Sequence, residues 1–279
     1  MTSIISATNL KALIGNENLL IIDATSGPRA KEIYTEKHLT GAQFVDLEKD
    51  LSTIDDPAHG GRHPLPSPQD FSKTLTNLRV HDDSHIVVYD RANGVNAAAR
   101  FWWMARAAGL KNVQVLDGGF SAAEAMDIPI ESGEITGLPQ SSFCFDTWQL
   151  PTITRAEVEA LTHDPKAVII DVREEARYAG VTEPIDLIAG HIPSAINIPL
   201  ANNLDSNGLF KDPQALYAYY KPFFVEADAQ KRVVHCGSGV SACHTLLALD
   251  YAGFEMPHLY VGSWSEWSRN ALPIATTAS

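Results

Sequence analysis

The chain has 279 residues, and its 21 Lys and Arg against 34 Asp and Glu leave a formal net charge of −13 at pH 7. With 45% hydrophobic and 20% charged residues, the composition is that of a globular protein, which excludes global disorder and fibrous repeats. The acidic balance excludes non-specific binding to nucleic acid, because phosphate backbones need a basic surface. No apolar run approaches the ~18 residues of a membrane-spanning helix.

The amino terminus and the cysteines bear on where the protein works. The first six residues lack the basic and apolar regions of a secretory signal, so none is expected. The three cysteines, Cys144, Cys236 and Cys243, are too few for a disulfide framework and form no Cys-x-x-Cys pair. These features predict a protein of the reducing cytoplasm.

Strand-like and helix-like segments alternate along the chain. Short apolar runs rich in β-branched residues are followed by loops and longer helical segments. That order predicts an α/β protein with mainly parallel sheets flanked by helices. The predicted strands are Leu19–Ala24, Ile86–Asp90, Ala167–Val172 and Arg232–His235, and the predicted helices include Ala97–Ala108 and Ala242–Ala252.

One internal repeat organises the chain. Four segments of the first half recur in the second half, in the same order and 144 to 153 residues later. A collinear set of matches with a nearly constant offset indicates two copies of one domain. The matched pairs are Leu19–Ala24 with Ala167–Val172, His38–Ala42 with His191–Ala195, Ile86–Asp90 with Arg232–Cys236, and Val115–Ser121 with Tyr260–Ser265.

The repeat sets the expected domain boundaries. We expect one domain at residues 1–135 and the other at residues 143–279, joined by a linker over roughly 131–142 that contains Gly, Pro and Ser. Phe143–Phe145 is a candidate for the first strand of the second domain. The polar stretch Leu51–Pro68 occurs in the first half alone, and a loop of this length is usually functional or disordered.

Cys236 stands at the point where open parallel sheets place their chemistry. The predicted strand Arg232–His235 ends just before it, and a short loop, Cys236–Ser241, leads into the next helix. Gly237 and Gly239 allow a tight turn whose backbone N–H groups point inward, next to a helix N-terminus. Such an environment stabilises a thiolate, which is the nucleophilic form of cysteine.

Cysteine is often buried only to fill a core, and that alternative has to be weighed for Cys236. Two features favour a functional role. Cys236 begins a Gly-x-Gly loop rather than lying within an apolar run, and its counterpart in the first copy is Asp90. The first copy has lost the thiol, so we expect one catalytic domain and one catalytically degenerate domain.

Motifs spread over nearly the whole chain carry a family resemblance. Those in the second half are Asp171–Arg173, Arg177–Gly180, Gly190–Pro193, Val234–Ala242 and Gly262–Trp267, and those in the first half are His63–Pro68 and Arg100–Met104. Together with the tandem halves, they resemble the rhodanese superfamily. Val234–Ala242 closely resembles the active loop of the 3-mercaptopyruvate sulfurtransferases. The resemblance implies two tandem rhodanese-like domains.

The resemblance also implies a two-step sulfur transfer. Cys236 would take a sulfane sulfur from a donor as a persulfide and pass it to an acceptor. The loop residues Gly237, Gly239, Val240 and Ser241 would bind the substrate and cradle the anionic sulfur with their N–H groups. No metal or organic cofactor is expected, because sulfur itself is the group carried and the histidines show no metal-ligand spacing.

Two observations narrow the chemistry. A phosphatase of the same fold is disfavoured, because its loop needs an arginine where Ala242 stands. Thiosulfate-specific members of the family carry basic side chains within the loop, whereas Ser238 and the flanking glycines are uncharged. The uncharged loop favours 3-mercaptopyruvate over thiosulfate as the donor.

Arg177 matches the substrate-binding arginine of the family, and a guanidinium suits bidentate binding of the donor carboxylate. The 3-mercaptopyruvate sulfurtransferases have a second arginine a few residues further on. This chain has no Arg or Lys between Arg177 and Lys211. Either another residue contacts the carboxylate or the donor binds weakly. Arg173 is available nearby, but it could equally be a structural ion-pair partner.

Ser238 and His63 are expected beside the nucleophile. In the family, a serine of the loop and a histidine from the first domain lie close to the cysteine, and Ser238 and His63 match these residues. The alternative for His63 is a solvated loop histidine without a role.

Other polar and aromatic residues near the loop are expected to be structural. The side chain of His235 points to the opposite face of its strand from Cys236. Cys243 is expected in the core, with a resolving role under oxidation left open. Trp264 and Trp267 are expected to pack around the rim of the site or at a domain interface.

Three functions remain in view. The leading one is a 3-mercaptopyruvate sulfurtransferase, and the alternatives are a thiosulfate sulfurtransferase and a non-catalytic module that binds a partner or senses oxidants. Rapid alkylation of Cys236 near neutral pH would favour an enzyme. The expected partners are a small-molecule sulfur donor and a cyanide or thiol acceptor, including a thioredoxin-like protein, with no nucleic acid and no membrane.

Overall fold

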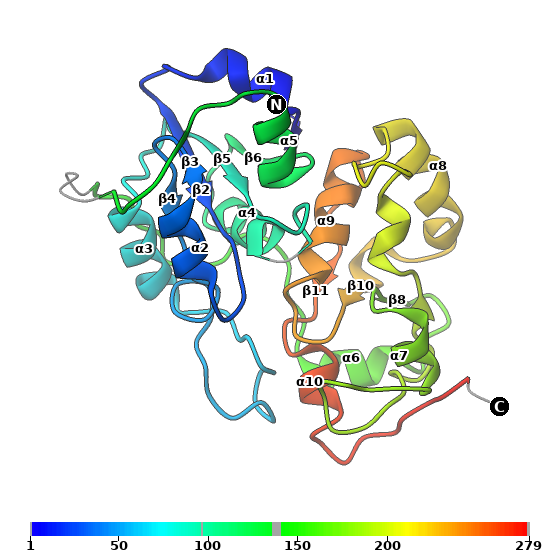
Figure 1. Cartoon of the computed structure of the whole chain (residues 1–279). Helices are drawn as coiled ribbons and strands as arrows, with labels where there is room; N and C mark the ends of the chain where they lie inside the picture. The colour runs from blue at the N-terminus through cyan, green and yellow to red at the C-terminus, as the bar shows by residue number, and fades with distance from the viewer. Residues whose placement is uncertain (1, 96, 136–140, 278–279) are drawn as a thin grey trace. The chain divides into compact units, whose positions relative to one another are not determined.

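The computed structural model describes residues 2–95, 97–135 and 141–277, and the chain forms two compact units (Figure 1). Unit 1 comprises Met1–Ser52, Pro66–Gln149 and Ser206–Phe210. Unit 2 comprises Thr53–Leu65, Leu150–Asp205 and Lys211–Ser279. The loop Thr53–Leu65 therefore belongs to unit 2, although it lies within the first half of the sequence.

Unit 1 is an α/β unit. Its strands are β1 (Ile4–Ile5), β2 (Leu19–Asp23), β3 (His38–Leu39), β4 (Gln43–Phe44), β5 (His85–Tyr89), β6 (Val113–Leu116) and β7 (Ile130–Glu131), and its helices are α1 (Ala7–Leu13), α2 (Ala30–Glu36), α3 (Pro68–Asn77), α4 (Ala97–Ala107) and α5 (Gly119–Ala125). A parallel sheet has the order β1-β6-β5-β2-β4, and β3 and β7 form a separate antiparallel pair. Helix α4 packs against β5 and β6. The central strands have continuous apolar sequences, as is typical of strands buried in a parallel sheet.

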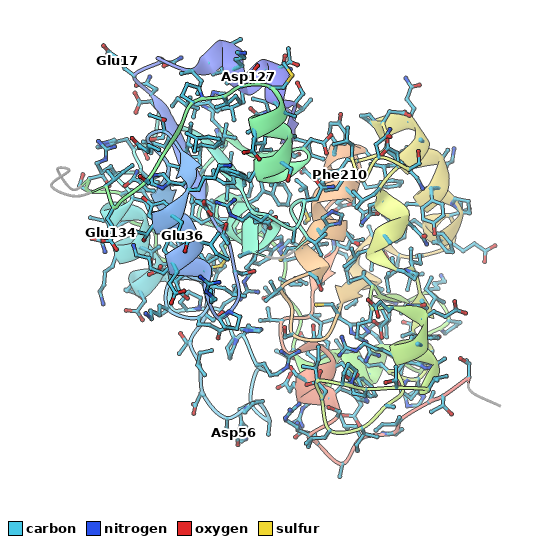
Figure 2. All side chains as sticks on the ribbon, viewed as in Figure 1. Glu17, Glu36, Asp56, Asp127, Glu134 and Phe210 are labelled. Carbon is cyan, nitrogen blue, oxygen red and sulfur yellow. The ribbon has the colours of Figure 1, made fainter. Side chains whose placement is uncertain are left out.

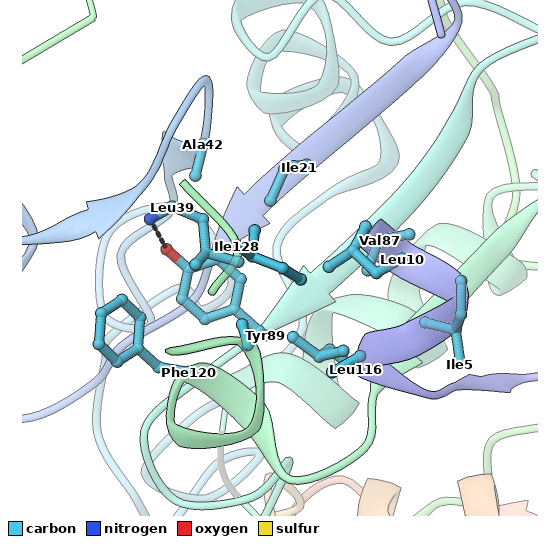
Figure 3. Close-up of a cluster of buried hydrophobic side chains, with 12 residues drawn as sticks. Ile5, Leu10, Ile21, Leu39, Ala42, Val87, Tyr89, Leu116, Phe120 and Ile128 are labelled. Carbon is cyan, nitrogen blue, oxygen red and sulfur yellow. Dashed lines mark hydrogen bonds between the residues drawn. The ribbon is translucent and has the colours of Figure 1, made fainter. Parts of the chain in front are cut away.

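A cluster of buried side chains forms a core of unit 1 around Tyr89 (Figure 3). Leu10, Val87 and Leu116 are fully buried in it. Full burial of such a side chain contributes roughly 1.5–3 kcal/mol. The Tyr89 hydroxyl accepts a hydrogen bond of 3.0 Å from the backbone N–H of Leu39, and burial raises the pKa of Tyr89. The hydroxyl therefore stays neutral, and its polar atom is satisfied inside the core.

Unit 2 repeats the α/β plan. Its strands are β8 (Val168–Asp171), β9 (Ile196–Asn197), β10 (Arg232–His235) and β11 (His258–Leu259), and its helices are α6 (Arg155–Leu161), α7 (Glu175–Ala179), α8 (Pro213–Phe224), α9 (Ala242–Tyr251) and α10 (Ser263–Trp267), with 3₁₀ turns η1 (Leu200–Asn203) and η2 (Ala229–Lys231). The strands form a parallel sheet in the order β11-β10-β8-β9. Helix α9 packs against β10 and β11, and α8 packs against α9. None of the described helices is long and apolar enough to cross a membrane.

Matching contacts in the two units confirm the internal repeat. In unit 1, the ring of Tyr34 stacks on His38 with 4.1 Å between centroids, and the His38 Nδ1 lies 2.7 Å from the Tyr34 carbonyl oxygen. In unit 2, Tyr178 stacks on His191 at 3.7 Å, and the same atoms lie 2.7 Å apart. Both tyrosine hydroxyls donate to the carbonyl oxygen of the alanine that ends the matched segment.

Two expectations need correction. Phe143–Phe145 forms no strand: this segment belongs to unit 1, where the Phe145 ring packs edge-on against Phe71. Trp264 and Trp267 lie in the hydrophobic core of unit 2, 0% and 1% exposed, rather than at a rim. Their indole N–H groups donate to backbone carbonyls, which satisfies the one polar atom of each side chain. Residues 136–140 of the expected linker lie outside the described residues.

The burial of His244 in unit 2 predicts that the protein loses stability in acid. His244 is fully buried, and burial lowers its pKa from 6.5 to about 3. Below about pH 6.5 the unfolded chain binds a proton at His244 that the folded chain does not bind. The free energy of unfolding should therefore fall as the pH drops from about 6.5 toward 3, by up to ~1.4 kcal/mol per pH unit from this residue.

Urea unfolding at pH 7, 6, 5 and 4 measures this slope. A His244→Asn variant should show a shallower decrease than the wild type. His59→Asn is the matched control, because the His59 side chain is 83% exposed and its imidazole meets water in both states. Equal slopes for the wild type and His244→Asn would contradict the prediction.

Candidate active site

Cys236 immediately follows the end of β10 and is 1% exposed. Its backbone N–H donates to the Ser263 hydroxyl at 3.2 Å, and its carbonyl accepts from the Trp264 N–H at 3.0 Å. The next carbonyl, of Gly237, accepts from the Ser265 N–H at 2.8 Å. The start of α10 thus holds the backbone of the cysteine loop in place at both of its first residues.

Gly239 lets the loop approach this neighbouring segment. Its φ is +74°, and a Cβ at this position would lie 2.4 Å from the carbonyl oxygen of Val261. A side chain at position 239 would thus suffer both backbone strain and a collision with backbone. The second glycine of the Cys236–Ser241 loop is therefore required by both backbone conformation and space.

The loop presents unpaired backbone donors beside the thiol. The N–H groups of Gly237, Ser238, Val240 and Ser241 donate to no acceptor among residues 2–95, 97–135 and 141–277. Unpaired N–H groups between a strand end and a helix N-terminus favour an anion, because their partial positive charges converge there. An anionic sulfur on Cys236 would meet these donors.

Unit 1 fills the equivalent position with an anion of its own. The Asp90 carboxylate accepts hydrogen bonds from the N–H groups of Ala92, Gly94 and Ala98 at 2.9, 2.8 and 3.2 Å. The Asp90 carbonyl accepts from the Phe120 N–H at 3.0 Å, as the Cys236 carbonyl does from Trp264. The loop after the strand in unit 1 therefore cradles an anion, and that anion is a side chain rather than a substrate.

The loop Thr53–Leu65 brings His63 to the cysteine loop. The His63 Nδ1 lies 2.8 Å from the Ser238 hydroxyl. Asp56 marks the exposed outer bend of this loop (Figure 2). Its other end is anchored to α10, because the Gly60 N–H donates to the Glu266 carboxylate at 3.0 Å and the Arg62 N–H to the Ser265 hydroxyl at 3.0 Å. The structure thus brings His63 next to Ser238, two residues after Cys236.

Arg177 lies over the first loop residue after the cysteine. A Cβ at Gly237 would lie 3.4 Å from the Arg177 Nη2 and 3.2 Å from the Arg62 Nη2. The Arg177 guanidinium also pairs with Glu183 at 2.7 Å and with Asp186 at 3.4 Å. Two guanidinium groups, one from each half of the sequence, therefore border the cysteine loop.

Arg173 is a structural ion-pair partner. Its side chain is 1% exposed and donates to the Asp171 carboxylate at 2.6 Å, to Glu183 at 3.2 Å and to a backbone carbonyl. Burial works against an ionised Asp171, but His235 and Arg173 outweigh it and hold the pKa of Asp171 below its usual range. Burial lowers the pKa of His235, which lies beside Asp171 inside the sheet. These residues hold the strand ends together.

Cys243 lies in the core next to the cysteine loop. Cys243 is fully buried in α9, and its thiol lies 3.5 Å from the carbonyl oxygen of Gly239. It packs against the cysteine loop, in keeping with the expected core position.

No cluster of three or more His, Cys, Asp or Glu side chains able to hold a metal ion occurs in the described part of the chain.

Comparison with known proteins places the chain in a family. The family model for the rhodanese-like domain matches residues 6–126 and again residues 154–270. The chain belongs to the rhodanese-like domain family. It carries two such domains in tandem, each with a mainly parallel sheet flanked by helices.

Relatives of this rhodanese-like protein match most of its length. The 3-mercaptopyruvate sulfurtransferase of Escherichia coli K12 is 35% identical over 286 residues, which cover 98% of both chains. A Mycobacterium tuberculosis protein, provisionally named thiosulfate sulfurtransferase SseB, is 38% identical over 86% of this chain and 84% of its own. The crystal structure of Escherichia coli SseA superimposes with a TM-score of 0.78 and 31% identity, covering 95% of this chain and 99% of that one. The chain is an enzyme of the sulfurtransferase class, which takes a small-molecule sulfur donor and an acceptor.

The sequence did not reveal Arg62, Asp186 and Arg269 as parts of this rhodanese-like site. Asp186 is buried and pairs with Arg62 at 3.1 Å, with Arg177 at 3.4 Å and with Arg269 at 2.8 Å. The signal available was position: Arg62 directly precedes His63, the loop residue that the resemblance had already singled out. The stretch between Arg177 and Lys211 contains no arginine, so the family pattern downstream of Arg177 does not point to Arg62.

The close approach of Gly61 to the start of α10 gives a test of how the loop Thr53–Leu65 packs on that helix. Gly60 and Gly61 both have positive φ, +88° and +82°, so an alanine at either position costs roughly 1–2 kcal/mol of backbone strain. A Cβ at Gly61 would also lie 2.4 Å from the Gly262 carbonyl oxygen, whereas one at Gly60 meets only Pro64 at 3.4 Å. Gly61→Ala should therefore displace Arg62 and His63 and lower kcat/KM for sulfur transfer by about 10²-fold.

Gly60→Ala is the matched control for that measurement. It carries the same backbone strain without the collision, so its kcat/KM should stay within about threefold of the wild type if strain alone costs little activity. Circular dichroism and thermal unfolding check that both variants are folded. An equal loss of activity in the two variants would contradict the seating of the loop on α10.

Proposed function

We propose that this sulfurtransferase moves a sulfane sulfur from 3-mercaptopyruvate to cyanide or a thiol through a persulfide on Cys236. The observation that carries the proposal is the contrast between the two loops. Asp90 fills the N–H cradle of unit 1 with its own carboxylate, whereas Ser238, Val240 and Ser241 keep unpaired N–H groups beside the Cys236 thiol. A cradle built for an anion, with a nucleophile at its edge, suits a negatively charged persulfide.

The first step forms a disulfide-like S–S bond. The Cys236 thiolate attacks the donor sulfur, the C–S bond of mercaptopyruvate breaks, and its electron pair goes to carbon, which leaves pyruvate enolate. The proton that the donor sulfur carried then moves to the enolate, which gives pyruvate and leaves the persulfide as an anion. Ser238 and His63 relay that proton, a role supported by the 2.8 Å between their polar atoms.

The second step returns the enzyme to its starting state. An acceptor anion attacks the outer sulfur of the persulfide, a new bond to that sulfur forms, and the Cys236 thiolate leaves. The N–H groups that cradle the persulfide also stabilise the departing thiolate. With cyanide the product is thiocyanate, and with a thiol it is a new persulfide.

Charge supports mercaptopyruvate as the donor. The guanidinium groups of Arg62 and Arg177, which pair with Glu183 and Asp186, border the loop and offer a positive charge to a bound donor. A monoanionic carboxylate matches that charge, and a guanidinium binds it bidentately. The dianion thiosulfate is the second candidate donor, favoured by the name of the Mycobacterium tuberculosis relative.

We further propose that unit 1 is catalytically degenerate and that the acceptor in the cell is a protein dithiol of the thioredoxin type. Asp90 is no nucleophile toward sulfur, and its carboxylate already occupies the N–H groups around it. None of the three cysteines forms a disulfide, which suits a reducing compartment such as the cytoplasm. Reduction of the Cys236 persulfide by thioredoxin, compared with glutathione at equal thiol concentration, tests the acceptor.

The test of the function is steady-state sulfur transfer to cyanide, with mercaptopyruvate and thiosulfate compared side by side. The wild type should show the higher kcat/KM with mercaptopyruvate, and Cys236→Ser should abolish transfer from both donors because no persulfide can form. Cys144→Ser is the matched control, since Cys144 is exposed and outside the site. A preference for thiosulfate would overturn the donor, and full activity of Cys236→Ser would overturn the mechanism.

The proton relay makes a separate prediction. Ser238→Ala and His63→Gln should each lower kcat by about 10²–10⁴-fold, the usual contribution of a positioned acid or base. Mass spectrometry after one turnover should still detect the Cys236 persulfide, formed slowly. His59→Gln, an exposed histidine in the same loop, is the control and should keep wild-type kcat. Wild-type kcat in both site variants would remove the relay from the mechanism.

A further inference from the structure

We propose that Arg62 binds the donor carboxylate together with Arg177 and so determines which donors react at Cys236. The proposal rests on the function proposed for Cys236 and adds a residue that the resemblance did not supply. This chain has no second arginine downstream of Arg177 before Lys211. The loop Thr53–Leu65 brings an arginine, Arg62, to the side of Arg177 from the other half of the sequence.

Both guanidinium groups lie next to the same residue, Gly237. A Cβ at Gly237 would lie 3.2 Å from the Arg62 Nη2 and 3.4 and 3.6 Å from the Arg177 Nη2 and Nη1. The Nη1 groups of Arg62 and Arg177 have no hydrogen-bond partner among the residues that the structure describes. Two planar guanidinium groups therefore keep donors available beside the residue that follows Cys236, where a carboxylate can accept from both.

Asp186 keeps Arg62 and Arg177 in this orientation. Its side chain is 0% exposed and accepts from Arg62 Nε at 3.1 Å and from Arg177 Nη2 at 3.4 Å. A buried carboxylate needs such partners, because an unpaired charge inside a protein is costly. The backbone of Arg62 is fixed as well, through its N–H bond to the Ser265 hydroxyl. The cations are therefore positioned before the donor arrives, which reduces the ordering cost of binding.

The size of the donor fits this placement. In mercaptopyruvate, two carbon atoms separate the sulfur from the carboxyl carbon, so a bound carboxylate has to lie close to the attacking sulfur. Gly237 is the next residue after Cys236, and both guanidinium groups border it. Arg269 differs from them, because it pairs with Asp186 and the Ser265 carbonyl and contributes none of the three side-chain atoms nearest to a Cβ at Gly237.

A pair of alkylating reagents tests this carboxylate site without any sulfur transfer. Iodoacetate and iodoacetamide form the same kind of C–S bond with a thiolate and release iodide, but only iodoacetate carries a carboxylate. The ratio of their rate constants at Cys236, followed by mass spectrometry of its peptide, reports attraction of a carboxylate. Arg62→Gln and Arg177→Gln should each lower this ratio by about 10- to 100-fold, the loss expected for a hydrogen bond between charged groups.

Matched arginine variants separate direct binding from general effects. Arg269→Gln removes a different partner of Asp186, and Arg29→Gln removes an exposed arginine of unit 1 that pairs with Glu32. Arg29→Gln should change the ratio by less than about threefold, and Arg269→Gln should lower it much less than Arg62→Gln does, given the small effect of charges that do not contact the ligand. An unchanged ratio in Arg62→Gln, or an equal fall in Arg62→Gln and Arg269→Gln, would overturn a direct role for Arg62.

Steady-state kinetics complete the test. With mercaptopyruvate, Arg62→Gln should raise KM by about 10- to 100-fold and change kcat much less, and Arg62→Lys should restore only part of the loss. An unchanged KM would contradict carboxylate binding by Arg62. If the wild type turns over no mercaptopyruvate at all, the proposed function fails, and the alkylation ratio still decides whether Arg62 binds a carboxylate.

Discussion

A loop of backbone N–H donors at the end of a parallel strand is the feature on which the chemistry of both units depends. A parallel strand followed by a tight loop and a helix leaves N–H donors without partners. Unit 1 satisfies three of them with the Asp90 carboxylate. In unit 2 the loop after the strand is held through Trp264 and Gly239 and presents a thiol at its edge. At the equivalent position, one loop therefore carries a carboxylate that satisfies its own N–H groups, and the other carries a thiol.

The charged residues behind the loop act as one framework. Asp171 pairs with Arg173, Arg173 with Glu183, and Glu183 with Arg177 at the loop, so ion pairs run from the strand ends to the site. Every carboxylate in this series is nearly buried, and each is paired. Losing one partner of a buried pair typically costs about 3–5 kcal/mol, because the remaining charge is uncompensated. The framework therefore holds its cations in fixed positions, and fixed charges need no reorganisation during a reaction.

The loop Thr53–Leu65 explains why the two halves of the sequence are not independent. This segment precedes most of unit 1 in the sequence but packs on α10 through Gly60, Gly61 and Arg62. It brings His63 to Ser238. A chain without its first half would lack both Arg62 and His63. The first half of the sequence therefore supplies side chains to the site around Cys236.

The sequence by itself determined the α/β class, the repeat and the cysteine loop, because these depend on local patterns: β-branched runs, matched segments and a Gly-x-Gly turn. It also predicted Ser238, His63 and Arg177 beside Cys236, through the family resemblance. Only the tertiary structure revealed Arg62 and Asp186, because their pairing joins residues 124 positions apart. Side-chain ion pairs over such separations leave no periodic pattern, and burial of Trp264 and Trp267 in the core likewise depended on packing that spacing alone does not encode.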